Sequence, residues 1–486
     1  MVVPAGETVA LDVDTPSLGG LTLDGTLVAC RRDLALTAEW ILVHGALRAG
    51  SEAQPFVDEL VITLTDTDQG ASVMGMGTRG IVVMGGELAL HGDAPDVEWT
   101  QLAAHAPTGS SNLTLAEPVD WSPGDRVAIT TTDWYGSSAT EQRVVASVGG
   151  GGTSVALSSP LAEDHWGVLQ HVTSSGMGLA PDPTVVPSEQ PTPLVLDERA
   201  EVANLTRPIT IQGADDDAWH DDGFGAHVMV MGLTSDVAVE GVQMLRVGQR
   251  GELGRYPMHW HRLSYDDDGD ELGDAEGHHI SSSTVTGSSN RCLTIHATNG
   301  VTLQDNVCVG VEGHGVFLED AVERRTTIVG NLVAQVRNPA YADALKQHEV
   351  EYDGGSSAFW LSNPDNVVAG NVAADAQGFG FWLAYPQQPV GLSSDVPIRP
   401  DRLEFGTFEG NTTHSNGHQG LMLDMVEQDD AGTTFPNQYW STTDGQEPSW
   451  PFDTLRRFTL HQVTTYKNAF GGFWNRATWP TYTEWV

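Results

Sequence analysis

Two histidines stand two residues apart in an apolar stretch of the chain. His259 and His261 flank Trp260. In a β-strand, side chains two residues apart point to the same face, so both imidazoles would face one ligand. The pattern predicts a site for a divalent ion, completed by His227 or His296, and imidazole ligands favour zinc, copper or nickel. The alternative is a polar ladder in which these histidines only form hydrogen bonds.

Two adjacent carboxylates follow a short apolar segment later in the chain. If Glu319 and Asp320 lie in a strand, they point to opposite faces, and only one is expected to face a groove with His296. A carboxyl group with a raised pKa can protonate a glycosidic oxygen, so we predict that one of the two is a general acid. Its pKa would be tuned by His314 or His296, while Arg255 would bind a substrate carboxylate through its planar guanidinium. The alternative is a turn and a strand with no catalytic role.

A short acidic loop carries aspartates at alternate positions. Asp266, Asp268 and Asp270 form an Asp-x-Asp-x-Asp sequence. Carboxylate oxygens are the ligands that calcium prefers. However, Gly269 occupies the fourth position of this loop, and no glutamate occupies the twelfth, as an EF-hand would require. The loop is therefore either a calcium site of another kind or a solvated acidic loop.

The composition limits the partners and the compartment of the chain. Its 486 residues have a formal net charge of −42, which argues against a nucleic-acid partner because phosphate binding needs a basic surface. The same charge repels an anionic polysaccharide, so a site for such a polymer must be locally basic. We expect no membrane span and recognise no signal peptide at the start of the sequence. Cys30, Cys292 and Cys308 are too few and too scattered to predict a disulfide framework or a zinc ribbon.

An asparagine recurs at the same place in a series of similar segments. Asn306, Asn331, Asn371 and Asn411 each end a short β-rich stretch, at spacings of 25 and then 40 residues that leave room for insertions. An irregular repeat of short strands with a stacked asparagine predicts a parallel β-helix. A β-propeller and a β-sandwich are the competing folds. The late aromatic residues suit either sugar stacking or the interior of such a coil.

The chain divides into three regions by pattern. Residues 1–165 read as short strands with glycine punctuation, and residues 166–199 as a loop or linker rich in Pro, Gly and Ser. Residues 200–486 carry the repeats and the candidate active-site residues. We therefore predict an all-β protein, with a small β-domain that packs against or caps the β-helix.

Several blocks resemble one known family. Leu18-Gly-Gly-Leu-Thr-Leu and the segment 36–45 resemble the G8 domain, which is named for its glycines. Further along, Gly254-Arg-Tyr-Pro-Met-His-Trp-His261 and the segments 291–300 and 313–320 resemble the G8-domain hyaluronidases. This family includes the cell-migration-inducing and transmembrane hyaluronidases and, more distantly, the fibrocystins. The blocks occur in the family's order over roughly residues 5–340, and the strongly acidic composition suggests a microbial member.

The resemblance implies a fold and an activity. It implies a G8-like β-domain followed by a right-handed parallel β-helix, an extracellular location and endo-cleavage of hyaluronan or a related glycosaminoglycan-like polymer. It also implies calcium dependence, whereas the histidine-rich ligand set favours zinc, copper or nickel. The alternatives are a non-catalytic carbohydrate-binding or adhesion module and a polysaccharide lyase. A lyase needs a base near the uronate, and with lysine nearly absent Arg255 would have to serve.

Overall fold

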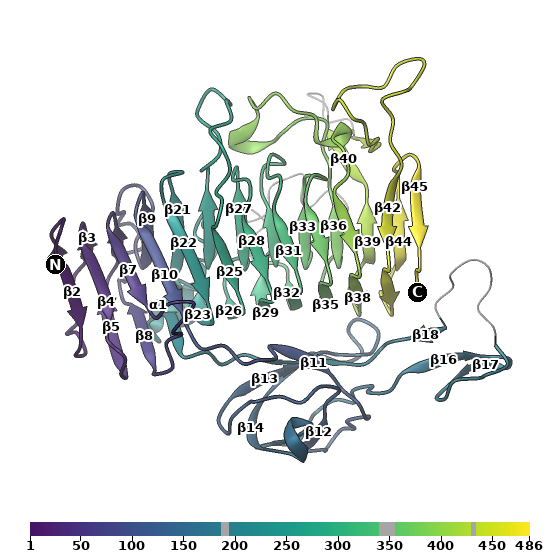
Figure 1. Cartoon of the computed structure of the whole chain (residues 1–486), viewed down its shortest axis with the longest axis horizontal. Coiled ribbons are helices and arrows are strands. Elements are labelled where there is room, and N and C mark those ends of the chain that lie inside the picture. The colour runs from purple at the N-terminus through teal and green to yellow at the C-terminus, as the bar shows by residue number, and fades with distance from the viewer. Residues whose placement is uncertain (186–193, 340–354, 429–433) are drawn as a thin grey trace.

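Three long parallel β-sheets form the body of the protein in the computed structural model (Figure 1). The structure describes residues 1–185, 194–339, 355–428 and 434–486. Successive strands pass from the first sheet to the second and then to the third, and each turn of the coil stacks on the one before it in parallel register. This is the predicted parallel β-helix.

The strands of each sheet are given in their order along the coil. The first sheet contains β1 (Val2–Val3), β3 (Leu21–Leu23), β6 (Ile41–Val43), β9 (Gly80–Met84), β21 (His227–Met231), β24 (Met258–His261), β27 (Leu293–His296), β30 (Val316–Leu318), β33 (Phe359–Leu361), β36 (Phe381–Leu383), β39 (Gln419–Leu423) and β44 (Gly471–Asn475). The second contains β2 (Thr8–Leu11), β4 (Thr26–Ala29), β7 (Ala46–Ala49), β10 (Glu87–His91), β22 (Asp236–Glu240), β25 (His279–Ser281), β28 (Thr302–Gln304), β31 (Thr327–Val329), β34 (Val367–Ala369), β37 (Thr407–Glu409), β42 (Phe458–His461) and β45 (Pro480–Thr483). The third contains β5 (Leu34–Ala38), β8 (Leu60–Leu64), β20 (Ile209–Gly213), β23 (Val242–Val247), β26 (Thr284–Ser288), β29 (Val307–Glu312), β32 (Leu332–Arg337), β35 (Val372–Ala376), β38 (Thr412–His414) and β43 (Thr464–Tyr466).

An antiparallel unit interrupts the coil between β10 and β20 and lies beside it (Figure 1). Its main sheet contains β11 (Trp99–Gln101), β12 (Asn112–Thr114), β13 (Arg126–Ile129), β14 (Glu141–Gly149), β15 (Ser154–Leu157) and β19 (Glu201–Asn204), and a smaller sheet contains β16 (Gln170–Thr173), β17 (Gly176–Gly178) and β18 (Val195–Leu196). Ala128, Ala203 and Leu205 of the unit pack on Val307 and Val309, which lie on the outer face of the third sheet. The unit is thereby fixed to the coil.

The predicted division into a separate amino-terminal domain and a later β-helix is wrong. The first strands are themselves turns of the coil, because β9 pairs with β21 and β8 pairs with β20 across the inserted unit. The expected linker at 166–199 contains β16, β17 and β18, and its residues 186–193 lie outside the described part. The repeat spacing could not predict this arrangement, because the strands that pair here are separated in sequence by the whole inserted unit.

The asparagine column is confirmed. The side-chain amide of Asn306 donates to Asn331 at 2.9 Å, Asn331 to Asn371 at 2.9 Å, and Asn371 to Asn411 at 3.0 Å. All four side chains are buried. Each therefore satisfies backbone groups at a turn that would otherwise be buried without a partner.

Apolar residues at alternate positions fill the inside of the coil. Trp260 and Phe381 are fully buried there, and the interior is one continuous cluster from Val3 to Val463. Cys292 and Cys308 form a disulfide inside this cluster. The sequence did not predict this single disulfide, although it correctly indicated that there is no framework of several disulfides. Helices are short: α1 (Asp217–Asp222) and the 3-10 turns at Gly150–Gly152, Gly391–Ser393 and Pro400–Arg402. Within the described ranges, no helix has the length and apolarity to cross a membrane.

Candidate active site

The outer face of the first sheet brings the predicted histidines together. His259 and His261 lie in β24 and point outward, while Trp260 between them points into the core. In the neighbouring strand β27, His296 lies opposite His261 in parallel register. The prediction that His259 and His261 share one face is therefore confirmed, and the register places His296 with them.

The two carboxylates complete this cluster. The strand β30 stacks on β27, and the backbone amide of Glu319 donates to the carbonyl of Ile295 at 3.0 Å. A carboxylate oxygen of Glu319 lies 3.7 Å from Nδ1 of His296, and a carboxylate oxygen of Asp320 lies 2.7 Å from its Nε2. The prediction that only one carboxylate faces His296 is wrong, because β30 ends at Leu318 and strand alternation no longer applies.

Three imidazoles lie close enough together to share one ion. The ring centroids of His259 and His261 are 5.0 Å apart, and those of His261 and His296 are also 5.0 Å apart. Among the described residues, two groups have three ligand atoms within 4.8 Å of one another: His259, His261 and His296, and His296 with Glu319 and Asp320. His296 belongs to both groups, so the two form one continuous set of donors.

One imidazole nitrogen is held ready for a ligand. Nδ1 of His259 donates to the carbonyl of Gly254 at 3.0 Å, which leaves Nε2 with its lone pair. Nε2 is buried and has no hydrogen-bond partner in the part of the chain that the structure describes. A hydrogen bond of this kind orients a metal-binding histidine, and a buried nitrogen without a partner is costly. The residues present therefore fit a divalent ion.

Burial and neighbouring charges divide the protonation states within the cluster. Burial lowers the pKa of His259 well below its ordinary value and that of His261 to about 4. Burial also acts to lower the pKa of His296, but the negative charges of Glu319 and Asp320 outweigh it and raise that pKa. His259 and His261 are therefore neutral at pH 7, as metal binding requires, while His296 binds either a proton or an ion.

His227 does not belong to this group. It lies in β21, where Gln249 donates to its Nδ1 at 3.3 Å and its Nε2 donates to the carbonyl of Met76 at 3.1 Å. Both ring nitrogens are thus occupied, and burial lowers its pKa to about 3. The prediction of His227 as a metal ligand is wrong, and His296 takes the third position.

Arg255 and His314 lie on different sides of the cluster. The guanidinium of Arg255 donates to the carbonyl of Gly75 at 3.1 Å, and its charge helps to lower the pKa of His261. His314 stacks on Phe317 and contacts Trp360, and its Nδ1 accepts from the amide of Ser357 at 3.0 Å. Arg255 is therefore near the histidines, whereas His314 belongs to a buried aromatic layer on the same sheet.

Two residues at the site were not predicted from the sequence. Oε1 of Glu323 accepts from the backbone amides of Ala297 and Asp320, at 2.7 and 3.0 Å, and so fixes the turn that carries Asp320. Burial and then the charge of Asp320 raise the pKa of Glu323 to about 7. The hydroxyl of Ser393 donates to Asp320 at 3.1 Å from a distant loop. In the sequence, the short spacing between Glu319 and Glu323 could have indicated that Glu323 lies at the site. Nothing in the sequence indicated the contact of Ser393 with Asp320.

The acidic loop is organised by its own hydrogen bonds. Oδ1 of Asp266 accepts from the backbone amides of Asp268 and Asp270, at 3.0 and 2.9 Å. Nearby, Arg325 forms a salt bridge with Asp274. The aspartates of this loop are therefore engaged in hydrogen bonds and a salt bridge at the surface. Among the described residues, its carboxylates do not form a group of three close ligand atoms.

The fold and the cluster define a parallel β-helix protein with a histidine–carboxylate site on one outer face. A model of the G8 domain matches residues 1–103, and a model named CEMIP beta-helix matches residues 223–421, which include the whole cluster. The chain belongs to the family of proteins that combine a G8 domain with this β-helix, as its sequence motifs predicted.

Curated relatives are similar in sequence over most of the chain. Human Fibrocystin-L is 31% identical over 87% of this chain, which spans about 10% of that protein. Protein rliB of Dictyostelium discoideum is 30% identical over 71% of this chain and 28% of its own length. Among solved structures, the catalytic domain of a GH87 alpha-1,3-glucanase aligns over 99% of this chain and 63% of its own, at 7% identity and a TM-score of 0.28. A periplasmic alginate epimerase aligns over 99% and 83%, at 9% identity and a TM-score of 0.27.

Proposed function

We propose that the chain is an extracellular, endo-acting glycoside hydrolase that cuts hyaluronan or a related glycosaminoglycan-like polymer with the help of a divalent ion. The observation that carries the proposal is the convergence of His259, His261, His296, Glu319 and Asp320 from three successive turns on one outer face. The match to the CEMIP β-helix supports a polysaccharide-active family. Outer faces of this kind can bind an extended polymer along the axis of the coil.

Glu319 supplies the acid–base group, and Asp320 positions His296. A carboxylate oxygen of Glu319 lies 3.7 Å from Nδ1 of His296, beside the grouped histidines, so we assign Glu319 as the general acid that protonates the glycosidic oxygen. Asp320 is fully buried and holds Nε2 of His296, so it acts as a positioning residue for that ring. When no ion is bound, the negative charges of Glu319 and Asp320 raise the pKa of His296 and favour its protonated form. With the ion on Nδ1, the Nε2 hydrogen would stay on Asp320.

The divalent ion would be held by His259, His261 and His296. When bound, it would supply Lewis-acid polarisation of a sugar oxygen. A set of three imidazoles favours zinc, copper or nickel over calcium, because calcium prefers oxygen ligands. Calcium dependence, which the family resemblance implies, would then need oxygen ligands elsewhere on the chain.

The charge around His261 suits a substrate carboxylate. The chain as a whole repels polyanions, but Arg255 and Arg262 both lower the pKa of His261 and therefore lie within its electrostatic reach. A planar guanidinium can bind a carboxylate with two hydrogen bonds. We assign Arg255 to the uronate carboxylate, as the sequence predicted. The Cys292–Cys308 disulfide supports an oxidising, extracellular location.

The decisive experiment separates cleavage from binding. The purified chain, loaded with zinc or calcium in turn, is incubated with hyaluronan and chondroitin, and new reducing ends and polymer size are measured. Glu319→Gln should reduce cleavage at least about 100-fold, and Asp320→Asn should shift the pH profile. The matched control is Glu312→Gln. Glu312 lies in β29 of the third sheet and pairs with Arg250, so this variant should leave cleavage unchanged.

Three outcomes would contradict parts of the proposal. Products that absorb near 232 nm would identify a lyase, because elimination leaves an unsaturated uronate. Binding of the polymers without shortening would identify a non-catalytic module. For the ion, His259→Ala and His261→Ala should each reduce bound metal to background in elemental analysis, with the exposed His220→Ala as control. Unchanged metal content in the first two variants would refute the ligand assignment.

A further inference from the structure

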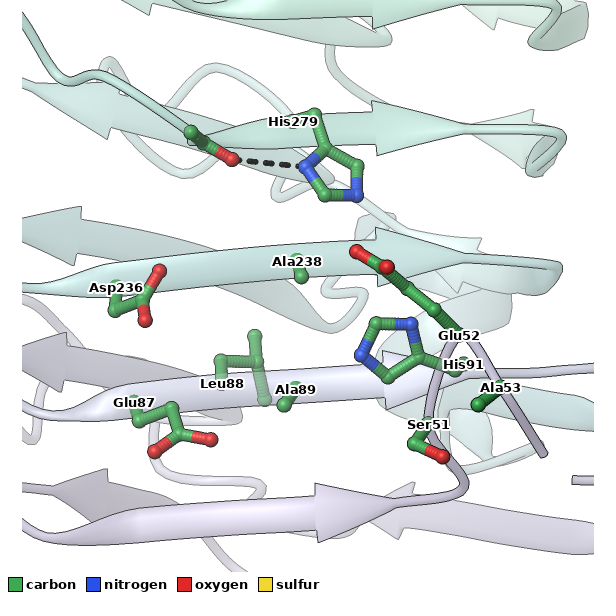
Figure 2. A pocket seen from close by; sticks show the side chains of 11 residues that line it. Ser51, Glu52, Ala53, Glu87, Leu88, Ala89, His91, Asp236, Ala238 and His279 are labelled. Carbon is green, nitrogen blue, oxygen red and sulfur yellow. Dashed lines mark hydrogen bonds between the residues drawn. The ribbon is translucent and has the colours of Figure 1, made fainter. Parts of the chain in front are cut away.

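A hollow lies on the outer face of the second sheet, away from the histidine–carboxylate cluster. It has a volume of about 480 Å³ and shares no residue with that cluster. Strands β10 and β22 form its floor, and the loop at 51–53 forms one wall (Figure 2). The walls carry Glu52, His91, Asp236 and His279, so most of the functional groups that face it are carboxylates and imidazoles.

A chain of hydrogen bonds fixes the two imidazoles. The carboxylate of Glu240 accepts from Nδ1 of His91 at 2.7 Å and from Nε2 of His279 at 2.8 Å. Nδ1 of His279 faces the carbonyl of Gly277 at 2.8 Å, so both nitrogens of His279 face acceptors and its ring is a cation. Glu240 is thus balanced by His279 and remains a carboxylate.

This arrangement leaves one acceptor aimed into the hollow. Because Nδ1 of His91 donates to Glu240, its Nε2 carries a lone pair when the ring is neutral. His91 is only 8% exposed, and the described residues donate no hydrogen bond to this nitrogen. Figure 2 shows the ring lying over the floor beside Ala89, with the carboxylate of Glu52 next to it.

The surrounding groups exclude two kinds of ligand. The described residues offer three clustered ligand atoms only at the first site, so a metal ion would lack protein donors here. A polyanion would be repelled by Glu52 and Asp236. The cationic ring of His279 is already paired with Glu240, and Arg48 is paired with Glu87. Hydroxyl groups, in contrast, can donate to the carboxylates and to Nε2 of His91, and the small side chains of Ala89 and Ala238 let a ring lie against the sheet.

We propose that this hollow binds a neutral saccharide unit, whose hydroxyls donate to Nε2 of His91 and to the carboxylates of Glu52 and Asp236. The site is independent of the proposed hydrolase activity and has the opposite charge preference. It would attach the protein to an uncharged glycan while the first sheet acts on an anionic polymer.

The test uses His91→Asn in the full chain. The amide of asparagine takes the place of Nδ1 and keeps the donor to Glu240, but Nε2 is lost. Binding of chitohexaose, cellohexaose and maltohexaose is measured by calorimetry and by saturation-transfer NMR. At least one should bind the parent, and His91→Asn should weaken that binding at least 10-fold. His220→Asn is the matched control, because His220 forms a similar pair with Asp215 on the open surface.

A second variant distinguishes the loss of the binding site from misfolding of the chain. Ala238→Leu fills the floor without removing a hydrogen bond, and it should also abolish binding. Glu319→Gln should leave it unchanged, which separates this site from the proposed active site. The inference is overturned if no neutral probe binds, if both His91→Asn and Ala238→Leu bind like the parent, or if a hyaluronan hexasaccharide displaces the neutral probe from the hollow.

Discussion

The asparagine column should supply a large share of the local stability of the coil. The sharpest perturbation is Asn331→Ala in the middle of the column. Oδ1 of Asn331 accepts from the backbone amide and the side-chain amide of Asn306. Its Nδ2 donates to the carbonyls of Leu303 and Val329 and to Oδ1 of Asn371. All of these groups are buried in the turn.

The magnitude follows from these bonds, which count as about four at full strength because the two amide hydrogens are shared among three acceptors. A buried hydrogen bond contributes about 1 kcal/mol net, so Asn331→Ala should lower the free energy of unfolding by about 4 kcal/mol, since its partners are left unsatisfied. Asn331→Leu keeps most of the volume and should cost nearly as much, which separates hydrogen bonding from cavity formation. Gln304→Ala, an exposed amide on the adjoining strand β28, should stay within about 0.5 kcal/mol of the parent.

The assay combines urea unfolding with hydrogen exchange followed by mass spectrometry. Exchange is needed because the turns of a solenoid can unfold separately, so one midpoint does not describe them all. Protection should fall first in the peptides that contain β28 and β31. If Asn331→Ala lies within 1 kcal/mol of the parent and protection is unchanged there, the column is not a stabilising element and the reasoning is refuted.

Three further outcomes follow from the structure. Hydrogen bonds from His279 and His91 hold the pKa of Glu240 at about 2, below its ordinary 4.5. The contribution of Glu240 to the free energy of unfolding is therefore present above pH 4.5 and is lost as the pH falls toward 2. Partial exposure limits that contribution to about 1–2 kcal/mol, and Glu240→Gln should remove this part of the acid dependence in urea titrations at pH 5 and pH 2.5. Cys308→Ala removes the Cys292–Cys308 disulfide, whose cysteines are 16 residues apart. In thermal melts in oxidising buffer, this variant should be less stable than the parent by about 3 kcal/mol. Once the parent is reduced, the two proteins should differ little in stability. Trp260→Ala should cost about 3–5 kcal/mol, because the indole is fully buried and donates to His278 at 3.2 Å, and a variant with parent-like denaturation would contradict this packing.

The sequence by itself determined the fold class and the faces of the strands. Alternation of side chains along a strand depends only on backbone geometry, so His259 and His261 could be placed on one face and Trp260 in the core. The asparagine repeat predicted the parallel β-helix, and the residue pattern predicted that one of Glu319 and Asp320 would face His296. These inferences are local, or they span a single turn of the coil.

The tertiary structure decided everything that depends on distant neighbours or on the ends of strands. Asp320 reaches His296 because the strand stops at Leu318, and alternation gives no information once the backbone turns. The unit inserted between β10 and β20 separates paired strands by more than a hundred residues, so the first strands could not be recognised as turns of the same coil. For the same reason the contact of His91 with Glu240, 149 residues apart, has no sequence signature: strand pairing across an insertion is set by packing on the shared core, not by spacing along the chain.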